Sequence, residues 1–140
     1  MNEHLVVRVI TKLLVPFILL FALYVQMHGD YGPGGGFQAG VIFATAFIVY
    51  AVVFGVGRTI RVVPLGVIIA MVASGVILYA GVGFAALAAG GEFLGYGAFD
   101  PQDPARGQHL GILLVELGVG ITVAGVMLAI FLTFAERRRP

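Results

Sequence analysis

Four long apolar runs divide this sequence, and they decide what the chain can fold into. They cover about residues 5–27, 37–57, 62–89 and 108–134. A helix that crosses the hydrocarbon core of a bilayer needs about 20 consecutive residues of this kind, and each run provides them. The runs are too long and too evenly apolar to be strands of a membrane barrel. The sequence therefore predicts an all-α membrane protein with four transmembrane helices.

The composition argues against a water-soluble domain. Hydrophobic residues make up 60% of the 140 residues and charged residues 11%, whereas an ordinary soluble domain has about 25% charged residues. A soluble domain of this size buries only about two-thirds of the surface of its unfolded chain, which is too little to hide so many apolar side chains. We therefore expect one membrane domain over residues 1–140, with the lipid bilayer as its solvent. The net charge of +1 gives no reason to expect a nucleic-acid partner.

Positive charges are distributed unevenly over the segments that connect the runs. In membrane proteins, Lys and Arg concentrate on the cytoplasmic side. Seven of the eight belong to the start of the first run, to the connection between the second and third runs, or to the C-terminus: Arg8, Lys12, Arg58, Arg61, Arg137, Arg138 and Arg139. The other two connections contain only Arg106, and they hold four acids: Asp30, Glu92, Asp100 and Asp103. Four spans with this distribution predict that both termini are cytoplasmic.

Glu116, inside the fourth run, is the first candidate for an ion path. Asp103 is a natural N-cap before Pro104 at the first helical position. A helix that starts between Asp103 and Gln108 places Glu116 roughly 12–20 Å from its end, near the middle of a core about 30 Å thick. Acids at that depth usually face a bundle interior or mark an ion or proton path. His109 shares the stripe of Glu116, about 10 Å away along the helix axis, with room for a water or an ion between them. The alternative is a neutral Glu116 that joins two helices by hydrogen bonds.

Glycines form a stripe on the opposite face of the same run. Gly111, Gly118 and Gly125 are spaced by seven residues, nearly two helical turns, and so share one face. Glycine inside a helix costs about 1 kcal/mol relative to alanine, and small residues let membrane helices approach closely. We expect a helix packed against this face, either from this chain or from another subunit.

A glycine-rich segment connects the first two runs and contains Pro33, Gly34, Gly35, Gly36 and Phe37. Consecutive glycines allow tight turns and close backbone approach. The segment is not a phosphate loop, because no Lys-Ser/Thr pair follows it and no strand precedes it. A tight extracellular turn is the simpler interpretation. The next residue, Gln38, is a candidate to present its amide to a neighbouring helix or to an ion.

Lys12 lies one turn before Pro16 in the first run. The proline removes the hydrogen bond to the carbonyl of Lys12, and that carbonyl is a candidate lining for an inner cavity. The simpler interpretation is a topological anchor whose ammonium group reaches the membrane surface. The sequence shows no nucleophile–base pair, no cysteine and only three scattered histidines. We therefore expect neither an enzyme active site nor a metal site, and no cofactor.

Two stretches resemble a known family. Residues 33–40, Pro-Gly-Gly-Gly-Phe-Gln-Ala-Gly, preceded by His28-Gly29, are similar to the signature of MnhB-type proteins, the B subunits of multi-subunit Mrp-type sodium/proton antiporters. Residues 116–125, which begin Glu-Leu-Gly-Val-Gly, are similar to the last helix of that family, where an acid also precedes Gly-Val. Four spans in about 140 residues match as well. The family differs in having a shorter polar stretch than residues 30–32 before the proline, which bears on the loop conformation.

The resemblance implies an accessory subunit in a large assembly that exchanges external protons for cytoplasmic sodium. Its partners would be the other membrane subunits, with Na⁺ and H⁺ as the transported ions. The chain would help to form the cation route or couple it to the proton-translocating subunits, with Glu116 at the acid position of the family. The alternatives are the equivalent subunit of a membrane-bound hydrogenase or respiratory complex, a purely structural scaffold subunit, and a stand-alone transporter. The chain shows no inverted repeat that would favour the last of these.

Overall fold

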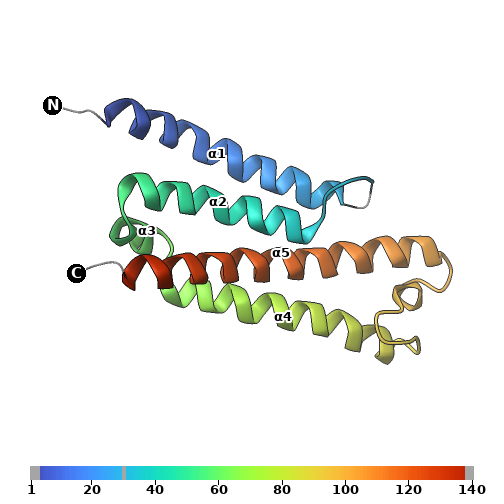
Figure 1. Cartoon of the computed structure of the whole chain (residues 1–140). Helices are drawn as coiled ribbons and strands as arrows, with labels where there is room; N and C mark the ends of the chain where they lie inside the picture. Colours follow the sequence, from blue (N-terminus) through green and yellow to red (C-terminus); the bar gives the residue numbers. More distant parts are fainter. Residues whose placement is uncertain (1–3, 30, 138–140) are drawn as a thin grey trace.

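A computed structural model describes residues 4–29 and 31–137 of the chain. Asp30, Arg138 and Arg139, which the charge argument uses, lie outside the described residues. The elements are α1 (Leu5–His28), α2 (Gly36–Phe54), α3 (Val56–Val62), α4 (Leu65–Ala88), the 3₁₀ helix η1 (Tyr96–Phe99) and α5 (Pro104–Arg137). All but α3 and η1 are long and apolar enough to cross a membrane. The predicted all-α fold with four membrane helices is confirmed (Figure 1).

The connection between the second and third spans differs from the prediction. Gly55 has a φ of 94°, a backbone conformation that favours glycine, and it ends α2 at Phe54. The chain then forms the short helix α3, which the sequence analysis did not anticipate. Pro64 precedes α4 with extended backbone angles (φ −61°, ψ 150°), and the residue before a proline is itself disfavoured in a helix. The third span therefore begins at Leu65, three residues later than predicted.

The start of α5 follows the predicted capping chemistry. The side-chain Oδ1 of Asp103 accepts a hydrogen bond from the backbone N–H of Arg106 at 3.3 Å. Asp100 Oδ1 accepts two more, from the N–H groups of Gln102 and Asp103 at 3.2 and 3.1 Å. These bonds satisfy amides that a helix start leaves without intrahelical partners. The predicted N-cap at Asp103 is confirmed.

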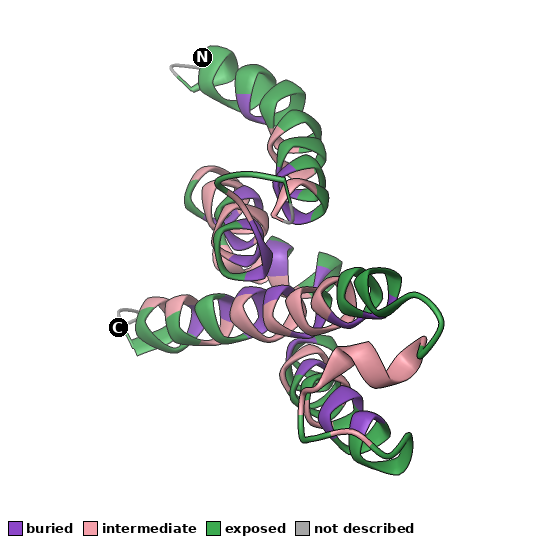
Figure 2. Ribbon diagram, turned by 90° about the vertical axis from the view of Figure 1, so that its right-hand side faces the viewer, coloured by how far each residue is buried: buried purple, intermediate pink, exposed green. Residues whose placement is uncertain are grey.

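The four membrane helices form an open row in the order α1, α2, α5, α4 (Figure 1). Helix α2 packs against α1 and α5, and α5 packs against α4. Among the described residues, α1 and α4 make no extended contact with each other. The solvent-accessible surface is 8805 Å², whereas a compact protein of this size exposes about 6,900 Å². Burial is concentrated along α2 and α5, and the row leaves much of α1 and α4 uncovered (Figure 2).

The main hydrophobic cluster lies at the end of the row that holds both termini. Its buried members come from α2, α4, α5 and the connection before α4: Ala44, Val63, Ile68, Leu128 and Leu132. Val56 and Ile60 of α3 pack against this cluster, while Arg58 and Arg61 of the same helix are exposed. Helix α3 therefore covers the cluster with its apolar side and turns its charges outward.

The glycine stripe of α5 faces α4 and η1. A Cβ atom at Gly118 would lie 2.9 Å from the backbone oxygen of Gly75 on α4, and one at Gly125 would lie 3.2 Å from another α4 backbone oxygen. A Cβ atom at Gly111 would overlap the ring of Tyr96 in η1. Burial, together with the nearby Tyr79, raises the pKa of the Tyr96 hydroxyl above its usual value. The neighbours of the stripe thus lie within the chain.

Candidate functional site

The glycine loop, which consists of Gly29 and residues 31–35, folds back over the end of α1. The backbone N–H of Gly35 donates to the carbonyl oxygen of Val25 at 3.1 Å, and the N–H of Gly32 donates to the carbonyl oxygen of His28 at 3.2 Å. Gly35 has a φ of 110°, which side chains with a Cβ atom rarely adopt. Helix α2 begins at the next residue. The loop is therefore a tight cap whose last residue needs to be glycine.

The carboxylate of Glu116 lies against this loop. A Cβ atom at Gly29 would be 2.6 Å from Oε2 and 2.7 Å from Oε1 of Glu116, and one at Gly35 would be 2.9 Å from Oε1. A Cβ atom at either position would force the carboxylate to shift, so the backbone of the loop itself lies against it. The side-chain Oε1 of Gln38 lies 3.8 Å from the same Cβ position at Gly35. The structure thus brings together Glu116, Gln38 and the glycine loop.

Close approach of α2 to α5 produces this geometry. A Cβ atom at Gly36 would overlap the carbonyl oxygen of Glu116 and lie 3.0 Å from the backbone nitrogen of Gly120. One turn later, a Cβ atom at Gly40 would lie 2.6 Å from the carbonyl oxygen of Gly120. Glycines four residues apart that meet a facing helix are typical of tight contacts between membrane helices. Gly36 therefore has two roles, as the last glycine of the motif and as a packing residue.

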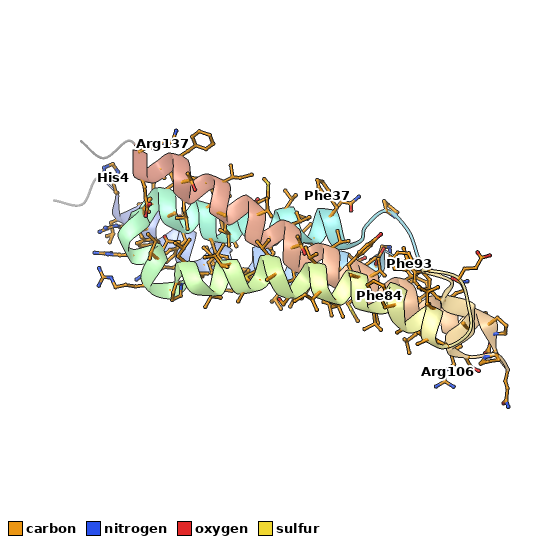
Figure 3. The ribbon with its side chains drawn as sticks, turned by 90° about the horizontal axis from the view of Figure 1, so that it is seen from below. His4, Phe37, Phe84, Phe93, Arg106 and Arg137 are labelled. Carbon is orange, nitrogen blue, oxygen red and sulfur yellow. The ribbon has the colours of Figure 1, made fainter. Side chains whose placement is uncertain are left out.

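The structure adds a relation between Glu116 and the neighbouring helices that residue counting along α5 did not predict. Counting residues along α5 predicts that Glu116 lies near the middle of the membrane. In the structure, α1 ends and α2 begins at the level of the Glu116 carboxylate. The 19 residues of α2 extend about 28 Å from there, nearly the thickness of a bilayer core. The ends of α4 and α5 that lie next to η1 continue past Phe37 at the start of α2, toward Arg106 (Figure 3). Glu116 thus lies level with the end of α1 and the start of α2.

The other two sequence candidates lie farther from this carboxylate. The ring of His109 is 6.0 Å, centroid to centroid, from the ring of Tyr31, and His109 is exposed, so it lies at the outer rim of the loop. Lys12 is near the opposite end of α1. Its Nζ atom is 5.8 Å from the ring centroid of Phe54, and the guanidinium carbon of Arg8 is 5.6 Å from the same centroid.

Gln26 is a polar residue of this region that sequence reasoning missed. It lies in the last turns of α1 and is 7% exposed. Its Oε1 atom would be 2.5 Å from a Cβ atom at Gly120, one turn beyond Glu116 on α5. Its Nε2 atom is buried and has no hydrogen-bond partner among the described residues. In the sequence, Gln26 stands out as a single amide inside an apolar run. An amide is costly to place in hydrocarbon, so this position was the signal that could have revealed it.

The chemistry of the site is that of oxygen ligands and one ionisable carboxyl group. Within residues 4–29 and 31–137, no three His, Asp or Glu side chains gather as ligands for a metal ion. Carboxylate, amide and backbone oxygens are the groups with which membrane proteins bind protons and alkali cations. The carboxyl group of Glu116 has the chemistry to hold one proton or to balance the charge of one such cation.

Comparison with known proteins identifies the family. The model of the domain related to the MnhB subunit of Na⁺/H⁺ antiporter matches residues 6–129. A protein of Staphylococcus aureus (strain Newman) named as antiporter subunit mnhB2 is 33% identical over 139 residues, 98% of each chain. The protein of the same name from Staphylococcus haemolyticus is 34% identical over 136 residues, 96% of each chain. The chain therefore belongs to the family of domains related to the MnhB subunit of Na⁺/H⁺ antiporters.

Proposed function

We propose that this chain is an accessory membrane subunit of a multi-subunit Na⁺/H⁺ antiporter, and that Glu116 takes part in its ion path. The observation that supports this proposal is the packing of the Glu116 carboxylate against the backbone of the glycine loop. The family assignment and the names of the relatives agree with it. The partners are then the other membrane subunits of the antiporter, in the cell membrane of a prokaryote.

The open row explains why the chain works as a subunit. A layer one helix thick has no protein wall on its two faces, so ions that move from Glu116 along the row would meet hydrocarbon. Charges in hydrocarbon are expensive, and transport paths are therefore enclosed by protein or water. Other subunits must cover the row before ions can pass along it. This argument favours a complex over a stand-alone transporter.

A single carboxyl group suits the exchange of one proton for one sodium ion. When Glu116 is protonated the site is neutral, and when a cation replaces the proton the site is neutral again. Binding both together leaves an uncompensated positive charge in a region of low dielectric constant, which is costly. In our proposal Glu116 therefore holds a proton or a sodium ion in turn, and it either lines the cation route or couples that route to the proton-translocating subunits.

The proposed orientation has both termini in the cytoplasm. His4 and Arg137 lie at one end of the row and Arg106 at the other (Figure 3), and α3 with Arg58 and Arg61 joins the inner ends of α2 and α4. The chain has no cysteine, so a single introduced cysteine reports its own location. We expect a membrane-impermeant maleimide to label Gln102→Cys in intact cells and Val62→Cys only after the cells are opened. The reverse pattern would show that the orientation is inverted.

The function itself is tested by sodium-driven proton movement. In everted vesicles from a strain that lacks this gene but keeps the remaining subunits, addition of Na⁺ should leave an imposed pH gradient unchanged. Return of the gene should restore the sodium response. The physical reason is that the path beside Glu116 is incomplete without this chain.

A further inference from the structure

We propose that the face of the row between α1 and α4 docks a transmembrane helix from another subunit. In this proposal an apolar side chain of that helix enters a cavity beside Gln26, and an oxygen atom of the helix accepts a hydrogen bond from the Gln26 amide. The proposal rests on the proposed function, because it needs an assembly with other membrane subunits. It adds a location and a recognition chemistry for one of them.

The cavity has a volume of about 130 Å³ and lies against all four membrane helices. Its floor is made by α2 and α5 and includes four small residues, Ala39, Gly40, Gly120 and Ala124. Leu23 of α1 and Met71 of α4 also line it, although α1 and α4 are not packed together. Small residues on a groove floor let another helix approach closely, which is how helices associate in lipid. The dimensions suit a side chain inserted from a neighbouring helix.

Gln26 is the only polar side chain that lines the cavity among the described residues. Its buried Nε2 atom lacks a hydrogen-bond partner there, although buried polar groups in native proteins are nearly always paired. The last torsion of a glutamine side chain is soft, and Gln26 lines the cavity, so its NH₂ group can turn to meet an acceptor there. The unpaired donor therefore indicates that an acceptor is supplied from outside the described chain.

A lipid or a water molecule fits these observations less well. A lipid acyl chain fills the apolar space but offers no acceptor to Gln26. A water molecule needs two to four polar partners, and the cavity wall supplies one polar side chain. A second copy of this chain would give an adduct of a different mass in the experiment below. A helix from another subunit supplies both the apolar filling and the oxygen acceptor.

The first test is photo-crosslinking in the assembled complex. Phe43 lines the cavity, and its replacement by p-benzoylphenylalanine keeps an aromatic ring there. We expect irradiation to join the chain to a different subunit, identified by mass spectrometry. Phe131, which packs against the internal cluster, is the matched position and should give no such adduct. An adduct at position 43 with a second copy, with lipid alone, or with nothing would overturn the proposal.

The second test removes the amide. Gln26→Leu places an apolar side chain without a donor at this position, so we expect retention of the neighbouring subunit through detergent purification to fall roughly 3- to 20-fold. The control is Gln102→Leu, which removes a glutamine from an exposed loop. It should not change the retention of the neighbouring subunit. Unchanged retention in Gln26→Leu, in a complex that still exchanges Na⁺ for H⁺, would refute the docking site and leave the proposed function intact. A chain that purifies without any other subunit would refute both.

Discussion

Glu116→Gln should reduce sodium-driven proton exchange on the order of 100-fold, in a complex that still assembles. Glutamine has nearly the same shape as glutamate, so it fits beneath the glycine loop, where a Cβ atom at Gly29 or Gly35 would already be within 2.9 Å of the Glu116 carboxylate. The amide cannot release a proton, and it does not balance the charge of a sodium ion. The measurement is the rate at which added Na⁺ collapses a pH gradient in everted vesicles, together with the amounts of the other subunits in the membrane.

The control for this substitution is Glu136→Gln, which changes an exposed acid near the other end of α5. It should exchange at the wild-type rate, because the residue lies about 30 Å from Glu116 along the helix. If Glu116→Gln also exchanges at the wild-type rate with an unchanged pH profile, Glu116 is not part of the ion path. The chain would then be a structural scaffold, in which the carboxyl group only joins helices.

Gly75→Ala should destabilise the chain by about 1–3 kcal/mol, the usual cost of overpacking. Gly75 is buried on α4, and its new methyl group would overlap the hydroxyl oxygen of Thr122 and lie 2.5 Å from the carbonyl oxygen of Gly118. These two α5 atoms are hydrogen-bonded to each other at 2.9 Å, so the hydroxyl cannot move away without losing that bond. The backbone of α5 cannot yield either without disturbing its whole contact with α4. The measurement is the thermal midpoint of aggregation in mild detergent.

Gly81→Ala is the matched control on the same helix. A Cβ atom at Gly81 would meet nothing within 4 Å, so the substitution adds only the better helix propensity of alanine, up to about 1 kcal/mol. We expect its thermal midpoint to equal or exceed that of the wild type. Equal midpoints for the alanine variants at Gly75 and Gly81 would contradict the described packing of α4 on α5.

Much of the fold was predictable because its causes are local. Each membrane helix needs a run of about 20 apolar residues, and such runs are visible without knowledge of the neighbours. The N-cap at Asp103 was predictable for the same reason, since its partner is three residues away. The break at Gly55 was not, because apolar residues lie on both sides of it. Glycine permits a positive φ but does not require one, so the presence of Gly55 does not by itself predict the break.

The arrangement around Glu116 depends on contacts between distant parts of the chain. Gly29 and Glu116 are 87 positions apart in the sequence, and their contact depends on how far α1 and α2 are shifted along α5. Counting residues along one helix gives a position on that helix and carries no information about such a shift. The same limit explains why the amide of Gln26 was overlooked. Its burial follows from close approach to Gly120, which only the packed helices reveal.

The most direct test of the account is the sodium response of everted vesicles with and without this chain. We expect Na⁺ to collapse an imposed pH gradient when the chain is present with the remaining subunits, to have little effect when the chain is absent, and to act again when the gene is returned. A sodium response of the same rate and the same dependence on Na⁺ concentration in vesicles that lack the chain would contradict the proposal that it is a working part of the antiporter.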